Sequence, residues 1–262
     1  MHGENKQWQE KLLEENKHLK KEVKKLTDQK KLAFEQSAIL FANLSHEVRN
    51  PLNGILGFAE LLRSEDIPCE EGKVYTSVIE ESGIALMNIV YDVFDLSKIK
   101  AGQYNVYPEA FDLNDMLFDL LMKYRSHAEY KELQLFVENM ISEEFVIHSS
   151  PGTILRVLSR LMDNAIKYTK AGWIKLSYKQ AEEYIIFKVE DTGIGIQEPT
   201  RSNLFNRFIE IEVSKSRKVS GTGLDLTLCN GLVGLLGGEI WHENRDEGGS
   251  VFFFSVKNHA KG

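Results

Sequence analysis

The 262-residue sequence contains little cysteine, little proline and no long apolar run. Its two cysteines, Cys69 and Cys229, lack metal-ligand spacing and are too few for a disulfide framework, so we expect reduced thiols and a cytoplasmic location. The apolar runs fall far short of the ~20 residues of a transmembrane helix, and the polar start does not resemble a signal peptide. A net charge of −7 argues against a nucleic-acid-binding protein, which would carry a basic face.

Proline is absent from residues 4–36, which are rich in lysine and glutamate and show a heptad pattern. The d positions are Leu12, Leu19, Leu26 and Ala33, and the a positions are Asn16, Val23 and Lys30. One asparagine at an a position favours a parallel, in-register dimer, because it pairs with its own copy. We predict that residues 1–36 form a coiled-coil dimerisation segment similar to a leucine zipper. The alternative is a solvated charged helix with accidental leucines.

Two amphipathic helices joined by a short connection are predicted over residues 37–104. The first has an apolar stripe at helical spacing, formed by Leu40, Leu44, Val48, Leu52, Ile55, Ala59 and Leu62. The second has a similar stripe, formed by Val74, Val78, Ala85, Ile89, Val93 and Leu96. Pro51 predicts a kink in the first helix, and residues 64–72 read as the connection. A lone hairpin cannot cover its own stripe, so two copies should form a dimeric four-helix bundle.

From residue 105 to the end, the pattern changes to a mixture of helices and strands. Helices are predicted at 112–129, 153–169 and 222–236, and strands at 133–137, 145–147, 174–178, 184–189, 240–242 and 251–255. Helices and antiparallel strands in this order predict an α+β sandwich, with the helices packed on one face of a sheet. The fold class is therefore a multidomain protein, with an N-terminal coiled coil and helical hairpin before an α+β sandwich.

A histidine, an adjacent carboxylate and an amide lie together on the first helix of the hairpin, at His46, Glu47 and Asn50. A neutral imidazole is a competent nucleophile near neutral pH, since its free pKa is ~6.5. Glu47 could hold the far ring N–H, and Asn50, one turn later, could orient a water beside a phosphorylated imidazole. A solvated histidine on a helix flank is the usual alternative. The glycine-rich segments further along the chain favour phosphoryl transfer instead.

Two glycine clusters are expected to hold a nucleotide. Asp191 ends a predicted strand and is followed by Thr192-Gly193-Ile194-Gly195-Ile196, whose glycines allow the backbone to approach a ligand. Its carboxylate can accept a hydrogen bond from an exocyclic amine such as that of adenine. The second cluster, Gly221-Thr222-Gly223-Leu224, opens a predicted helix, where free N–H groups and the helix dipole favour phosphate. The first cluster alone is a weak signal, since a tight turn also uses Gly-x-Gly.

Two further segments fit a nucleotide site. Between the glycine clusters, an apolar anchor at 204–208 precedes a basic stretch at 215–218, as in a mobile nucleotide lid. A surface loop with a charge run is the alternative. On the helix at 153–169, Asn164 offers a neutral oxygen ligand to Mg²⁺, and Lys167 lies near enough to reach phosphate oxygens. These two residues could equally form the solvent-exposed face of a half-buried helix.

Taken together, these motifs resemble the core of a sensor histidine kinase of a bacterial two-component system, from about residue 36 to residue 257. Residues 46–51 are similar to the phosphoacceptor box and residues 164–169 to the end of the N box. The two glycine boxes and the F box correspond to 191–196, to 221–224, and to Phe205 with Phe208. The resemblance implies a dimerisation and histidine-phosphotransfer hairpin over residues 37–104. It implies a Bergerat-fold (GHKL) ATP-binding domain over residues 105–262.

The resemblance also implies the chemistry. The γ-phosphoryl group of Mg-ATP would pass to His46 and then to an aspartate of a response-regulator receiver domain, in a homodimer. Many members also dephosphorylate that partner, with the residue at the Asn50 position aligning water. The implied catalytic residues are His46, Glu47 and Asn50, and the implied Mg²⁺ ligand is Asn164. The implied ATP-binding residues are Asn164, Lys167, Tyr168, Asp191, Gly193, Gly195, Ile196, Phe208, Gly221, Thr222, Gly223 and Leu224.

Four positions depart from the family pattern. Arg160 stands where the N box usually has an asparagine, and Asp225 replaces the last glycine of the second glycine box; Ser150 and Thr153 stand where an aspartate and an arginine are common. An aspartate on the first turn of a phosphate-facing helix is unfavourable for a tetra-anionic nucleotide unless it is neutralised. We therefore expect Arg160 and Asp225 to form an ion pair across the pocket, with weaker ATP binding than in a typical member. Otherwise Asp225 points to solvent and activity is normal.

Three functions follow from these residues. The leading hypothesis is an ATP-dependent protein-histidine kinase in which a linker at 101–108 lets the ATP domain swing towards His46. The second is a degenerate dimeric scaffold that docks receiver domains but phosphorylates poorly because of Arg160 and Asp225. The third is an ATP-gated clamp of the gyrase kind, which shares the Bergerat fold but is disfavoured by the helical hairpin.

Overall fold

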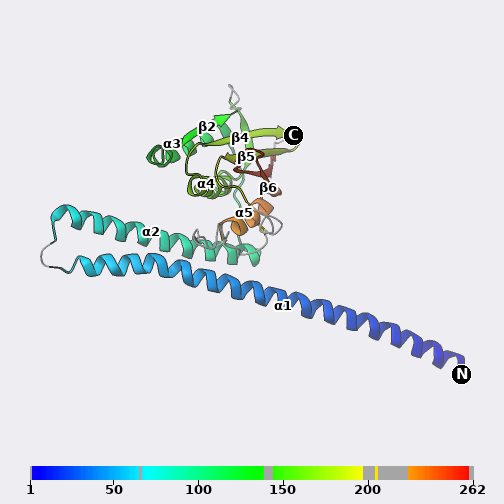
Figure 1. Cartoon of the computed structure of the whole chain (residues 1–262). Coiled ribbons are helices and arrows are strands. Elements are labelled where there is room, and N and C mark those ends of the chain that lie inside the picture. The colour runs from blue at the N-terminus through cyan, green and yellow to red at the C-terminus, as the bar shows by residue number, and fades with distance from the viewer. Residues whose placement is uncertain (1, 65–66, 139–143, 197–203, 206–223, 260–262) are drawn as a thin grey trace. The chain divides into compact units, whose positions relative to one another are not determined.

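The structure is a computed structural model, which describes residues 2–64, 67–138, 144–196, 204–205 and 224–259 (Figure 1). The chain divides into two compact units, Met1–His46 and Glu47–Gly262. None of the helices in the described part of the chain combines the length and the apolar character that crossing a membrane requires.

The N-terminal segment is helical throughout. Helix α1 runs from His2 to Leu61 as one 60-residue helix, and it continues through Pro51. The predicted seam residues Leu19, Val23 and Leu26 are exposed in the single chain. In a coiled coil, a partner helix would cover such an exposed apolar stripe. The helix is therefore compatible with the predicted coiled coil, which stays a prediction.

Helices α1 and α2 form the predicted hairpin. Helix α2 runs from Cys69 to Lys100, so it begins inside the segment expected to be the connection. The ring of Phe58 on α1 lies 5.5 Å from that of Tyr75 on α2. Further from the connection, a Cβ atom added at Gly54 would lie 2.8 Å from Ser82 Oγ, so a glycine lets the two helices approach closely. Many large apolar side chains remain exposed on the two helices, including Leu52, Leu56, Ile84, Met87, Tyr91 and Phe94.

The C-terminal part is an α/β sandwich. Its five-stranded sheet has the order β2-β4-β5-β7-β6. The strands are β2 (Gln134–Glu138), β4 (Trp173–Ala181), β5 (Tyr184–Asp191), β6 (Ile240–Asn244) and β7 (Ser250–Lys257). The helices are α3 (Leu113–Tyr130), α4 (Pro151–Tyr168) and α5 (Leu224–Leu235). The three helices lie on one face of the sheet, as predicted (Figure 1), and the core between them is apolar, with Leu158, Leu161, Phe187 and Phe254 fully buried.

Two features of the sandwich differ from the expectation. Strand β1 (Glu109–Asp112) was not predicted; it pairs with β3 (Val146–Ser149) in a separate two-stranded sheet. Strand β2 pairs with β4 in parallel, whereas the strands were expected to be antiparallel. The connection from β2 to β4 contains helix α4, and a crossover of this length allows two neighbouring strands to run in the same direction.

Candidate nucleotide and phosphoacceptor site

Asp191 is a buried carboxylate among the predicted nucleotide-binding residues. It ends β5 and is 3% exposed, and its Oδ1 accepts hydrogen bonds from Gly193 N (2.8 Å) and Ser250 N (3.4 Å). Burial raises the pKa of this carboxyl to about 6, although both backbone N–H groups favour the charged form. A carboxylate fixed at the end of a strand can recognise a ligand through an N–H group without moving.

The glycines after Asp191 are required by close packing and by backbone conformation. A Cβ atom at Gly193 would lie 2.6 Å from the carbonyl oxygen of Tyr168, so the turn packs directly against the end of α4. Gly195 has φ +67°, a left-handed conformation that glycine adopts without steric cost. Ile196 is buried. The structure therefore brings the predicted segment 191–196 beside the predicted segment at the end of α4.

Three residues that support this turn were not found from the sequence. Asn244, at the end of β6, accepts a hydrogen bond from Ile196 N through Oδ1 (3.1 Å) and donates one to Ile196 O through Nδ2 (2.7 Å). A Cβ atom at Gly249 would lie 2.0 Å from Asp191 O, and Ser250 donates its N–H to Asp191. The sequence Gly248-Gly249-Ser250 signals a turn, but it does not signal which distant segment the turn contacts.

The residues predicted on α4 lie at its C-terminal end. Asn164 and Tyr168 are half-buried, and Lys167 is exposed with its Nζ 5.3 Å from the centre of the Tyr168 ring. Thr169, just after the helix, has a buried hydroxyl with no hydrogen-bond partner among the described residues. The donor set suits Mg²⁺ carried on a nucleotide, because Mg²⁺ usually takes one or two protein oxygens and completes its shell with phosphates and waters. The described residues contain no cluster of three His, Cys, Asp or Glu side chains able to hold a metal ion by themselves.

Part of the predicted site lies outside the described residues. This applies to Phe208, Gly221, Thr222 and Gly223, and to the basic stretch 215–218. Leu224 begins α5 and is buried. Phe205 is half-buried, and its ring stands edge-on to that of Phe252 at 6.4 Å, in keeping with an apolar anchor.

The predicted ion pair between Arg160 and Asp225 is present, with Arg160 Nη1 2.6 Å from Asp225 Oδ1. A second contact was not predicted: Arg160 Nη2 donates to Asp92 Oδ1, which belongs to α2 of the hairpin. The neighbouring residue Arg156 makes a similar contact with Asp95 of α2. Both arginines of α4 therefore contact the hairpin, and Arg160 also contacts α5.

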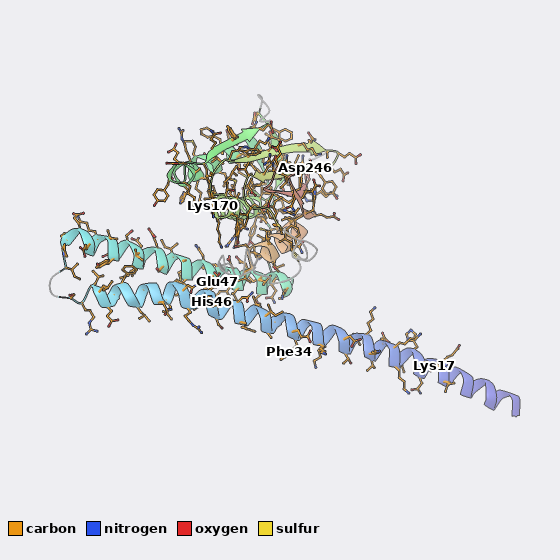
Figure 2. All side chains as sticks on the ribbon, in the orientation of Figure 1. Lys17, Phe34, His46, Glu47, Lys170 and Asp246 are labelled. Atoms are coloured by element: carbon orange, nitrogen blue, oxygen red, sulfur yellow. The ribbon has the colours of Figure 1, made fainter. Side chains whose placement is uncertain are left out.

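The predicted phosphoacceptor is accessible. His46 and Asn50 are exposed on α1, and Glu47 is half-buried. Figure 2 shows His46 and Glu47 side by side on this helix. His46 is the last residue of the first compact unit and Glu47 is the first residue of the second. The imidazole of His46 is therefore accessible to solvent on the surface of α1.

Two family models match the chain. The model of the His Kinase A (phospho-acceptor) domain matches residues 37–102. The model of the histidine kinase-, DNA gyrase B-, and HSP90-like ATPase matches residues 150–260. The first match includes His46 and the second includes Asp191 and both glycine clusters.

Curated relatives are much longer than this chain. The hybrid signal transduction histidine kinase K of Dictyostelium discoideum is 34% identical over 236 residues, which cover 85% of this chain and 19% of that protein. The autoinducer 2 sensor kinase/phosphatase LuxQ of Vibrio vulnificus is 34% identical over 225 residues, which cover 84% of this chain and 26% of that protein. The chain thus spans about a quarter or less of the length of these relatives.

Solved structures share the fold. The histidine kinase AdeS of Acinetobacter baumannii superposes with a TM-score of 0.64 at 25% identity, over 82% of this chain and 98% of that one. The histidine kinase ThkA, in a complex with the response regulator protein TrrA, superposes with a TM-score of 0.60 at 22% identity, over 86% of this chain and 63% of that one. The second likeness is at the level of the fold alone.

Proposed function

Because the chain belongs to the sensor histidine kinases, with a His Kinase A domain followed by an ATPase domain of the gyrase and HSP90 type, we propose that it phosphorylates His46 from ATP. The phosphoryl group then passes to an aspartate of a response regulator. The attacking imidazole nitrogen forms a P–N bond to the γ-phosphorus, and the P–O bond to the leaving ADP breaks.

The observation that carries this proposal is the buried Asp191, locked by two backbone N–H groups at the end of β5. A buried carboxylate is stable only where hydrogen bonds compensate for its lost hydration. With Oδ1 occupied by Gly193 and Ser250, the second carboxylate oxygen is the candidate acceptor for the exocyclic amine of adenine. Gly193 and Gly195 keep the neighbouring backbone free of side chains, so that a flat base can approach.

The triphosphate would lie between the end of α4 and the start of α5. Asn164 offers an amide oxygen for Mg²⁺, and Lys167 offers a mobile positive charge for phosphate oxygens. Bound Mg²⁺ would supply charge neutralisation on the phosphates. Leu224 is buried in the first turn of α5, and the dipole at the N-terminal end of a helix favours anions.

At the acceptor, Glu47 is the residue proposed to hold the imidazole in the tautomer whose lone pair faces the phosphate. Asn50 lies one turn later and is exposed; it is proposed to align the water that dephosphorylates the response regulator. The name of the relative LuxQ, a sensor kinase/phosphatase, supports this second activity. The complex of ThkA with TrrA supports a response regulator as the partner.

The working unit is proposed to be a homodimer. The hairpin leaves large apolar side chains exposed along both helices, and the zipper-like stripe of α1 is exposed as well. Joining two hairpins into a four-helix bundle would bury these surfaces together.

The test is incubation with γ-labelled ATP and Mg²⁺. We expect an acid-labile label on the wild-type chain and none on His46→Gln. His18→Gln is the matched control, since His18 is also an exposed histidine on α1, and it should retain the label. Calorimetric titration with Mg-ATP should show binding to wild type and to His46→Gln, but binding to Asp191→Asn should be weakened at least about tenfold, or 1.4 kcal/mol. Equal labelling of His46→Gln and wild type would refute the proposal.

The second candidate is a degenerate scaffold that docks receiver domains. Asp225 favours it, because this residue places an acidic group at the start of the phosphate-facing helix, and the ion pair with Arg160 neutralises that charge only by engaging an arginine that could otherwise bind phosphate. A chain that binds a receiver domain but neither binds ATP nor becomes labelled would support the scaffold over the kinase.

A further inference from the structure

The last three turns of α2 contact α4 and α5 through three residues on one face. Asp92 and Asp95 face the two arginines of α4, and Ile99 packs against Gly231 of α5. A Cβ atom at Gly231 would lie 3.0 Å from Ile99 Cγ2, so this glycine forms a shallow notch for the isoleucine. All these residues belong to the second compact unit of the chain.

Arg160 is the residue that joins the three helices. Its guanidinium binds Asp225 of α5 through Nη1 and Asp92 of α2 through Nη2. The side chains of Asp92, Arg160 and Asp225 are 6%, 23% and 32% exposed, respectively, so the pair on the α2 side is the more deeply buried. Burial raises the pKa of Asp92 to about 6, although Arg160 acts to lower it. Arg160 therefore compensates only partly for the hydration that the Asp92 carboxylate loses on burial, and another anion can compete with Asp92 for Arg160.

The same arginine adjoins the residues assigned to ATP. Arg160 lies four residues before Asn164 on α4, so the two side chains share one face of the helix. Asp225 is the second residue of α5, next to Leu224. Arg160 is thus placed between the proposed triphosphate and the contact with α2.

We propose that Arg160 is a nucleotide-responsive latch: it holds the ATP-binding domain on α2 through Asp92, and the triphosphate of ATP draws it away. This inference rests on the proposed function, since it requires a nucleotide at Asn164 and Asp191. Asp225 keeps the guanidinium near the start of α5 in both states. Release from Asp92 frees the domain to move away from α2 and towards a phosphoacceptor.

The competition has a clear direction. A guanidinium pairs bidentately with phosphate as well as with carboxylate, and a triphosphate presents several negative charges where Asp92 presents one. Such a coupling is reciprocal: if ATP weakens the contact with α2, the contact must weaken ATP binding by the same factor. Removing the charge of Asp92 should therefore raise the affinity for ATP, by roughly 5-fold or more for a typical coupling.

The geometry provides a direct probe of the latch. A Cβ atom at Gly231 would lie 3.9 Å from Ile99 Cβ, within the usual range of about 3.5–4.5 Å for a disulfide. The double substitution Ile99→Cys with Gly231→Cys also removes the isoleucine atoms that a side chain at 231 would meet. Cys69 is exposed and is replaced by serine, whereas Cys229 is buried and can remain. The control pair is Ile99→Cys with Gly234→Cys, because a Cβ atom at Gly234 meets nothing within 4 Å.

We expect the disulfide between positions 99 and 231 of the double variant to form readily under mild oxidation. With a saturating Mg²⁺ complex of a non-hydrolysable ATP analogue, it should form at least about 5-fold more slowly. Asp92→Asn should slow it without nucleotide and should raise the affinity for the analogue, measured by calorimetry. Glu70→Gln, which removes an exposed acidic group elsewhere on α2, should change neither. The oxidised protein should lose labelling of His46 and regain it on reduction.

The outcomes separate the latch from the kinase. If the analogue binds but the cross-linking rate is unchanged, the latch is wrong and the proposed function stands. If Asp92→Asn alters neither the rate nor the affinity, Asp92 does not hold the domain and the latch is again wrong. If no nucleotide binds to the chain, both proposals fail.

Discussion

The ATP-binding domain and the helical hairpin differ in how far they bury their large apolar side chains. In the domain, Phe187 and Phe254 are both fully buried and stack with their ring centres 4.7 Å apart. In the hairpin, Phe94 is 60% exposed, and it is one of many large apolar side chains at the surface of α1 and α2. The domain therefore completes its core within one chain, whereas the apolar surface of the hairpin remains uncovered. The difference supports the proposals that the single chain binds the nucleotide and that a dimer presents His46.

The largest effect is expected from a cavity in the domain core. Phe187→Ala should lower the free energy of unfolding of the domain by about 3–5 kcal/mol, because it removes a fully buried ring. Phe94→Ala should leave that unfolding transition unchanged and should weaken dimerisation instead. Urea titration followed by tryptophan fluorescence measures the first, and sedimentation at several concentrations measures the second. Equal losses of domain stability in both variants would remove the distinction between the two regions.

A charge in the predicted seam of α1 should separate the protomers. Leu26→Lys places two like charges at a d position of a parallel dimer, so the dissociation constant should rise at least about tenfold, or 1.4 kcal/mol. Lys25→Ala lies outside the seam and should have no such effect. Sedimentation equilibrium measures both variants. A dissociation constant that Leu26→Lys leaves unaltered would mean that residues 1–36 are a solvated helix, and that only the hairpin dimerises.

Acid should weaken nucleotide binding in the domain. Burial raises the pKa of Asp191 to about 6, so the carboxylate predominates above pH 6 and the neutral acid predominates below it. If the carboxylate form binds adenine, the affinity for ATP should fall about tenfold from pH 7 to pH 5. The contribution of this group to folding stability runs the other way: a raised pKa makes it largest at low pH, and it declines as the pH rises through 6.

Calorimetry on His46→Gln with Asp92→Asn measures this pH dependence without the phosphoacceptor and without Asp92, whose pKa burial also raises to about 6. In this background Asp191→Asn should bind weakly at every pH and should show no transition near pH 6. A transition that persists in Asp191→Asn would assign the effect to another group.

The smallest effect concerns two glycines on one helix. Gly234 is exposed and an added Cβ would meet nothing, so Gly234→Ala should stabilise the domain by up to about 0.5–1 kcal/mol. Gly231→Ala should not, because its Cβ would press on Ile99 at 3.0 Å. Thermal unfolding of the two variants side by side measures the difference. Equal stabilisation would mean that α2 and α5 are not in contact in solution.

Local patterns predicted most of the fold. The stripes of α2, α3 and α4 and the strands β4, β5 and β7 all repeat at helical or strand spacing, so their positions could be predicted to within a few residues. Strand β1 has only four residues, and its pairing with β3 is non-local, so no periodic signal marks it. The parallel direction of β2 depends on the path of the crossover through α4, which composition does not define.

The local geometry of the candidate site was predictable where its residues are neighbours in sequence. Asp191, Gly193 and Gly195 form one short segment, and the structure gives each the local geometry expected from its chemistry. Asn244 and Gly249 support the same segment from about 50 residues away, and only the sheet brings them close. Arg160 and Asp225 were paired because the family resemblance places both at the triphosphate pocket and their charges are opposite. The contact between Asp92 and Arg160 was not predicted, because it depends on how α2 packs against the ATP-binding domain.

The account depends most on His46 as the phosphoryl acceptor of this chain. Mass spectrometry at neutral pH, after incubation with Mg-ATP, locates the phosphoryl group on a residue directly. The prediction is a phosphoramidate on the peptide that contains His46. It should be absent from Asp191→Asn when both proteins are incubated with the same, low concentration of ATP. A stable phosphate on a serine, threonine or tyrosine, with His46 unmodified, would contradict it.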